Sequence, residues 1–133
     1  HLPQPNPEAV REMWEKINTL QKDGKILSAA AVGEGGVLLR LFEMALGSGK
    51  GCQIETEFLP DALLSLFCEM TGTMIIEVSS DNVDVVRERR GAIPLGKIKK
   101  GYSVNVEHSG ELFSFPVEDL ILVWQKPFKE VVR

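Results

Sequence analysis

The chain has 133 residues, of which 44% are hydrophobic and 26% are charged, and its formal net charge is −4. This length and balance suit one globular domain with a core of its own, and we expect residues 1–133 to form a single domain. The negative net charge argues against a nucleic-acid partner and against an anionic membrane surface. No apolar stretch approaches the ~20 residues of a membrane span, and no leader with a cleavage site opens the chain, so a cytoplasmic location is expected.

Cysteine usage and the first residue bear on the cellular context. Cys52 and Cys68 are too few and too far apart for a disulfide framework or a Cys-x-x-Cys metal site, which predicts buried free thiols in a reducing compartment. The chain begins with His1 instead of methionine. We therefore expect a fragment of a larger multidomain protein.

Hydrophobic periodicity, capping residues and glycine or proline breaks predict the secondary structure. In chain order, the expected elements are a helix over residues 7–20, a strand over 26–32, a helix over 35–46, a strand over 50–56, a short helix from Pro60, a strand over 73–78, a helix over 81–90, strands over 93–98, 102–107 and 111–115, and a helix from Pro116 to a break at Pro127. This order favours an α+β fold with a mixed β-sheet flanked by α-helices.

Several expectations concern burial. The strand at 26–32 carries no charge and is expected to be buried on both faces, and the β-branched strand at 73–78 is expected to be central. Trp14 and Trp124 lie on the apolar faces of the two terminal helices, where we expect them to pack in the core. Arg40 in the second helix is expected to face solvent.

Gly33, Glu34, Gly35 and Gly36 form a turn between the strand at 26–32 and the helix that follows. A glycine turn that opens a helix presents backbone N–H groups that can hold an anion, usually a phosphate, and glycine removes side chains that would block its approach. Glu34 has three open roles: binding magnesium, binding a substrate hydroxyl, or capping the helix start. The alternative is that the glycines serve geometry alone.

Other motifs lack the residues that their chemistry requires. The turn is not a dinucleotide fingerprint because Leu38 stands at the third glycine, and residues 47–51 are not a Walker loop because Gly51 stands at the magnesium-binding Ser or Thr. His108, the only internal histidine, falls in a predicted hairpin turn where a solvated imidazole is expected, so neither a catalytic triad nor a zinc site is predicted. The basic stretch at 87–100 is expected to be a solvated helix end.

Taken together, segments across the chain resemble a known family. The segments that carry the resemblance are Ser28–Val37, Phe42–Gly47, Gly51–Ile54, Thr73–Val78, Ile93–Ile98 and Leu120–Pro127. They look like the phosphoribosylformylglycinamidine synthases, also called formylglycinamide ribonucleotide amidotransferases. The similarity is to the C-terminal type of domain of the aminoimidazole ribonucleotide synthase superfamily, in the second copy of a long fused enzyme, and it extends over residues 7–128.

The resemblance implies an ATP-dependent C–N ligase of purine biosynthesis that converts formylglycinamide ribonucleotide, glutamine and ATP to the amidine. ATP and magnesium are expected in the full-length enzyme, bound mostly by domains absent here. The expected partners are an N-terminal-type synthase domain and a glutaminase domain of the same chain, together with the small-molecule substrate. The positions carried over as phosphate-binding are Gly33, Glu34, Gly35 and Gly36, with no catalytic residue and no metal ligand.

Two departures from the family pattern favour a supporting role. Many relatives have Ser-Asp-Gly-Gly in this turn, and Ala30 stands where the fused enzymes often have a histidine. We therefore expect the domain to support the cleft and to be inactive alone. The alternatives are another ATP-dependent enzyme of the superfamily, of the selenophosphate synthetase, thiamine-phosphate kinase or hydrogenase-maturation type, or a noncatalytic interface module.

Overall fold

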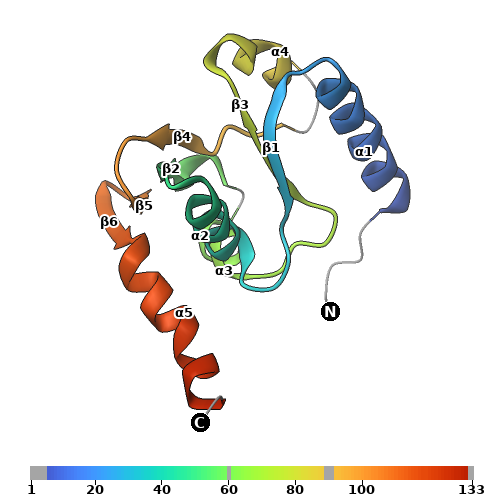
Figure 1. Ribbon diagram of the computed structural model, residues 1–133. Helices are drawn as coiled ribbons and strands as arrows, with labels where there is room; N and C mark the ends of the chain where they lie inside the picture. The colour runs from blue at the N-terminus through green and yellow to red at the C-terminus, as the bar shows by residue number, and fades with distance from the viewer. Residues whose placement is uncertain (1–5, 60, 89–91, 132–133) are drawn as a thin grey trace. The chain divides into compact units, whose positions relative to one another are not determined.

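The computed structural model describes residues 6–59, 61–88 and 92–131, and its backbone contacts fall into two compact units. The first unit comprises residues 1–40 and 63–94, and the second comprises residues 41–62 and 95–133. Figure 1 labels the helices and strands of both units. Helix α2, Gly36–Ser48, begins in the first unit and ends in the second.

Helix α1, Pro7–Lys22, opens the first unit as the sequence predicts. The Asn6 side chain accepts hydrogen bonds from the backbone N–H groups of Glu8 and Ala9, with donor–acceptor distances of 3.0 and 3.4 Å. These bonds satisfy donors that the first turn of a helix leaves without an intrahelical partner. The start of α1 is therefore fixed locally.

The strands of the first unit form a two-stranded antiparallel sheet, β1 (Ile26–Ala31) with β3 (Met74–Val78). Positions in β1 alternate between half-buried and exposed, and all positions in β3 are half-buried. The predictions of a strand buried on both faces and of a central strand are therefore wrong. Two of the three exposed positions in β1 are alanine, and exposing so small a side chain costs little, whereas Leu27 exposes a large one.

The other elements of this region are short. They are α3 (Ala62–Phe67), a 3-10 turn η2 (Ser80–Asn82) and α4 (Val83–Arg87). The helix expected over 81–90 corresponds to η2 and α4, while residues 89, 90 and Pro60 lie outside the described residues. The buried apolar side chains of the first unit are Ile17, Leu20, Val32, Val37, Leu66 and Val86.

Trp14 is half-exposed, so its predicted place in the core is wrong. Helix α1 packs against β1 in the first unit, and the residues that it buries are Ile17 and Leu20. A two-stranded sheet covers a narrow strip, so the remainder of the apolar face of α1 lies at its rim. Helical periodicity identified the apolar face correctly, but not how much of it another element covers.

A four-stranded mixed sheet organises the second unit, in the order β4-β2-β5-β6. Strands β2 and β5 are parallel, and the other neighbouring pairs are antiparallel. The bounds of the strands are β2 (Gly51–Glu55), β4 (Gly96–Lys99), β5 (Ser103–His108) and β6 (Glu111–Pro116), and a 3-10 turn η1 (Thr56–Phe58) follows β2. The predicted α+β fold with a mixed sheet is confirmed.

The predicted hairpin joins β5 to β6. His108 pairs with Glu111 across a two-residue turn, in which Ser109 and Gly110 have φ angles of 52° and 81°. Positive φ at both central positions is characteristic of a type I′ turn, whose twist matches that of the strands on either side. The His-Ser-Gly signal in the sequence therefore placed this turn correctly.

The core of the second unit is centred on β2 and β5, the two interior strands. Ile54 is 2% exposed, and Val104 and Val117 are completely buried. Gly96 lies opposite Ile54 in the register of β2 and β4, and a Cβ atom at Gly96 would collide with the backbone of Gln53. The close approach of β4 to β2 therefore requires glycine at this position.

The two cysteines differ in exposure. Cys52 is buried in β2, and desolvation by burial raises the pKa of its thiol from 9.0 to about 11. Cys68 follows the end of α3 and is exposed. The prediction of buried thiols is therefore confirmed for Cys52 and wrong for Cys68, which lies just beyond α3 on the exposed side.

Helix α5, Val117–Val131, closes the second unit and continues through Pro127, so the predicted break at this proline is wrong. Proline leaves the carbonyl of Val123 without its helical N–H partner. Both residues are exposed, so water can satisfy that carbonyl. Trp124 is half-exposed and its predicted core role is also wrong: Val117 anchors the helix to the sheet, and later turns extend beyond it (Figure 1).

We expect Ile54→Ala to lower the free energy of unfolding by roughly 2–5 kcal/mol, because it leaves a cavity between the interior strands. Ile98 in β4 is 48% exposed and provides the matched control. Ile98→Ala should cost less than about 1 kcal/mol. Urea unfolding followed by circular dichroism measures both values, and equal losses would contradict this location of the core.

Candidate functional site

The glycine turn lies in the first unit, between β1 and α2. The Gly36 N–H donates to the Gly33 carbonyl at 3.1 Å, which closes a four-residue turn. Gly35 and Gly36 have φ angles of 83° and 69°, a region that glycine enters without steric penalty. The turn thus leads directly into α2, whose first N–H groups have no acceptor within the helix.

Gly33, Gly35 and Gly36 differ in how closely other atoms approach them. A Cβ at Gly36 would lie 2.5 Å from the carbonyl oxygen of Leu66, so the backbone of α3 approaches too closely for any side chain. A Cβ at Gly35 would lie 2.5 Å from Cδ2 of Leu39. At Gly33 the nearest atom is Nη2 of Arg40, at an ordinary contact distance of 3.7 Å. Gly36 is therefore fixed by packing, whereas Gly33 leaves space beside a guanidinium group.

Arg40 brings a positive charge to the turn, which the sequence analysis missed by assigning this residue to solvent. The side chain is half-buried, and its guanidinium lies beside Gly33. Helical side chains lean toward the N-terminus, so an arginine four residues after Gly36 reaches back over the first turn. The four-residue spacing between Gly36 and Arg40 was therefore the signal in the sequence from which this contact could have been predicted.

Glu34 is exposed at the tip of the turn. Its carboxylate opposes an anion at the same place, so Glu34 can serve an anion only through its backbone. Among the residues that the structure describes, no group of three His, Cys, Asp or Glu side chains is placed to hold a metal ion.

The chemistry of the turn suits an anion such as a phosphate group. The N-terminus of a helix carries a partial positive charge and outward N–H donors, and a guanidinium can donate two parallel hydrogen bonds to phosphate oxygens. Beside Gly33, the Cβ position lies at an ordinary contact distance from the guanidinium of Arg40. No described histidine, cysteine or serine belongs to the turn, so the arrangement can bind and orient an anion but offers no nucleophile.

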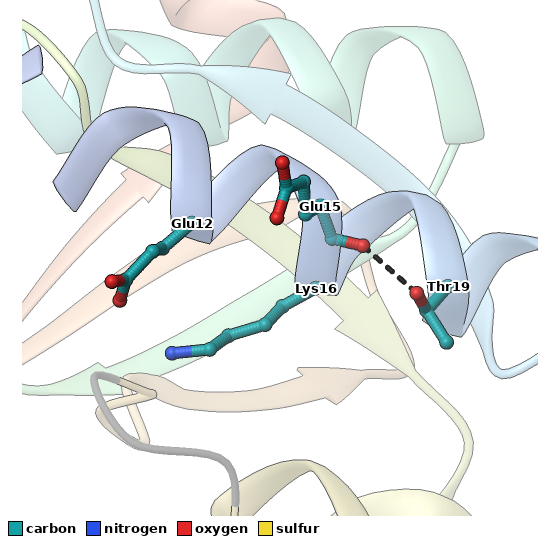
Figure 2. Close-up of a pocket in the computed structure, with 4 residues that line it drawn as sticks. All are labelled: Glu12, Glu15, Lys16 and Thr19. Atoms are coloured by element: carbon teal, nitrogen blue, oxygen red, sulfur yellow. Dashed lines mark hydrogen bonds between the residues drawn. The ribbon is translucent and has the colours of Figure 1, made fainter. Parts of the chain in front are cut away.

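Two surface hollows lie elsewhere. The first, of about 210 Å³, is lined by four residues of α1 alone, and its one internal hydrogen bond runs from the Thr19 hydroxyl to the Glu15 carbonyl at 2.9 Å (Figure 2). Because one helix supplies every lining residue, this hollow is a groove along a helix surface. It gathers no set of groups suited to catalysis.

The second hollow, of about 520 Å³, lies in the second unit beside the ends of β2 and β5. It contains His108, whose Nδ1 is hydrogen-bonded to Oγ1 of Thr56 at 2.7 Å. The expected exposure of His108 is confirmed, while its hydrogen bond to a buried threonine was not foreseen. Thr56 is too buried to attack a substrate, so this pair does not form a nucleophilic site.

Comparisons with known sequences identify related proteins. The sequence profile described as "AIR synthase related protein, C-terminal domain" matches residues 1–108. Phosphoribosylformylglycinamidine synthase subunit PurL of Methanococcus aeolicus is 28% identical, over 98% of this chain and 18% of that protein. The PurL subunit of Thermus thermophilus is also 28% identical, over 99% of this chain and 18% of the relative. The chain therefore spans less than a fifth of the length of these relatives.

A viral protein and solved structures match as well. Probable membrane antigen 3 of Saimiriine herpesvirus 2 is 31% identical over 62% of this chain and 7% of its own length. T. maritima PurL complexed with FGAR superposes with a TM-score of 0.77 at 19% identity, covering 87% of this chain and 21% of that chain. T. maritima PurL complexed with ATP superposes with a TM-score of 0.70 at 18% identity, covering 78% of this chain and 20% of that chain. These superpositions establish the fold.

No helix among the described ranges has the length and apolar character needed to cross a bilayer.

We expect Gly36→Ala to lower the free energy of unfolding by roughly 2–4 kcal/mol, because it combines a left-handed backbone with a collision against Leu66. Gly47 lies in the same helix, and nothing lies within 4 Å of the place that a methyl group would take there. Gly47→Ala should therefore stabilise the protein by about 0.5–1 kcal/mol. Chemical denaturation distinguishes the two, and a harmless Gly36→Ala would refute the packing constraint.

Proposed function

The chain belongs to the family of AIR synthase related proteins, C-terminal domain, and from this membership we propose that it is the C-terminal-type domain of a phosphoribosylformylglycinamidine synthase. Its 133 residues then form one domain of a larger cytoplasmic ligase and are inactive alone. The family profile supports one domain because it runs through both structural units. The PurL relatives support the multidomain context because they match almost the whole chain and are far longer.

In this proposal, the glycine turn and Arg40 hold a phosphate group of the nucleotide or of the substrate. Gly33, Glu34 and Gly35 contribute backbone N–H groups, Gly36 shapes the turn because its N–H donates to the Gly33 carbonyl, and Arg40 contributes charge. The observation that carries the proposal is the 3.7 Å distance between Arg40 Nη2 and the Cβ position of Gly33, at the start of a helix. This chain's residues position an anion, and the turn itself moves no proton.

Other domains of the enzyme would complete the reaction. ATP bound with magnesium would transfer a phosphoryl group to the amide oxygen of the substrate and leave as ADP. Ammonia from a glutaminase domain would then attack the amide carbon, and the phosphorylated oxygen would leave as inorganic phosphate. The N-terminal-type synthase domain would contribute most ligands of ATP and magnesium.

A noncatalytic interface module is the second candidate, and the contact between Gly36 and Leu66 favours it. That contact explains one glycine of the turn by packing alone. In this case the turn would have no affinity for phosphate, and the domain would contribute only surface to the enzyme. Anion binding separates the two candidates.

We expect calorimetry to detect binding of inorganic pyrophosphate and ATP to the chain. Arg40→Gln should weaken binding by about tenfold, through loss of a charged hydrogen-bond donor. Glu34→Gln should strengthen it about threefold, because it removes a repulsive charge. Arg11→Gln removes an exposed arginine that pairs with Glu15 on α1, and should leave affinity unchanged. Equal affinities for the Arg40 and Arg11 variants would contradict the phosphate site.

The ligase assignment has its own experiment. The longer protein that carries this segment should form the amidine from formylglycinamide ribonucleotide with ATP and either glutamine or ammonium. The 133-residue chain alone should form none, because the proposal assigns most ligands of ATP to the N-terminal-type synthase domain. Absence of turnover by the longer protein, or turnover by this chain alone, would overturn the assignment.

A further inference from the structure

Helix α5 carries an exposed apolar stripe along one side. Its members recur at spacings of three and four residues and lie on one side of the helix. Val123 is 70% exposed and Val131 is 82% exposed. The stripe consists of Leu120, Val123, Trp124, Pro127 and Val131. Only Leu120, near the sheet, is half-buried.

Opposite charges border this stripe on one side. Asp119 precedes Val123 by four residues and Lys126 follows it by three, so both lie next to Val123 on the helix surface. Both side chains are exposed. The acidic residue is near the beginning of α5 and the basic residue is near its end, an order that is self-complementary when two copies of the helix run antiparallel.

We propose that the α5 stripe binds a second copy of this chain, as an antiparallel helix pair about a two-fold axis. With the axis between Val123 and Trp124, Val123 faces the partner's Trp124. Asp119 then lies two residues, about 3 Å of helix rise, from the level of the partner's Lys126, within reach of a lysine side chain. The symmetry forms this ion pair twice.

The charge order selects the antiparallel arrangement. In a parallel pair, the charged flanks of the two helices would lie on opposite sides of the interface, so Asp119 could not reach the partner's Lys126. Helix α5 has 15 residues and is about 22 Å long, so two such helices bury less than the roughly 1,200 Å² of a stable interface. The dimer is therefore weak and depends on concentration. It does not depend on the proposed ligase function.

Sedimentation velocity over a wide range of protein concentration tests the proposal. The wild-type chain should pass from monomer to dimer as concentration rises. Val123→Glu should remain monomeric, because it puts a charge at the centre of the stripe. Leu122 is 62% exposed on roughly the opposite side of the same helix, so Leu122→Glu is the matched control and should still dimerise.

A charge exchange distinguishes a specific pair from general apolar association. Asp119→Lys should raise the dissociation constant by about tenfold, since two attractive pairs become repulsive. Combining Asp119→Lys with Lys126→Asp should restore the wild-type constant. Both variants leave the stripe intact, so they test the interface even where Val123→Glu disturbs the helix.

Three results would overturn the proposal. A wild-type chain that stays monomeric at every concentration would show that the stripe has a different occupant. Dimerisation of Val123→Glu as strong as that of Leu122→Glu would place the contact elsewhere. A double charge exchange as weak as Asp119→Lys alone would exclude the antiparallel pair.

Discussion

The close approach of the α3 backbone to Gly36 is the constraint on which the glycine turn depends. The carbonyl oxygen of Leu66 occupies the place of a Cβ at this position, and the backbone of Gly36 is left-handed. Both demands are met by glycine alone. They set where α2 begins, and so also where the N–H groups of its first turn and the Arg40 guanidinium lie within the first unit.

This constraint also explains how one turn supports two functional interpretations. A glycine required by packing would be present whether or not a phosphate binds, so the glycines by themselves say little about ligands. Arg40 is different, because it adds a positive charge beside Gly33, which a turn shaped by packing alone does not supply. The proposed phosphate site therefore depends more on this arginine than on the glycines that first drew attention to the turn.

The sequence predicted the positions of helices, strands and turns more accurately than it predicted which side chains are buried. The Asn6 cap, the hairpin turn at residues 108–110 and the strands of the mixed sheet are all encoded within a few neighbouring residues, and the structure contains them. Trp14 and Trp124 were expected in the core because their helix faces are apolar, yet both are half-exposed. Periodicity reports which face of a helix is apolar, whereas burial requires another element to lie against it.

The sequence by itself determined the helices and strands, the α+β class and the glycine turn, because caps, turns and periodic patterns act over short distances along the chain. The tertiary structure decided that β1 and β3 form a narrow sheet, that α3 approaches Gly36, that α5 continues through Pro127, and that Arg40 reaches the turn. The narrow sheet and the approach of α3 to Gly36 depend on residues far apart in the chain. The continuation of α5 through Pro127 and the position of Arg40 depend on which side of each helix is exposed to water, and that is decided only when the elements pack.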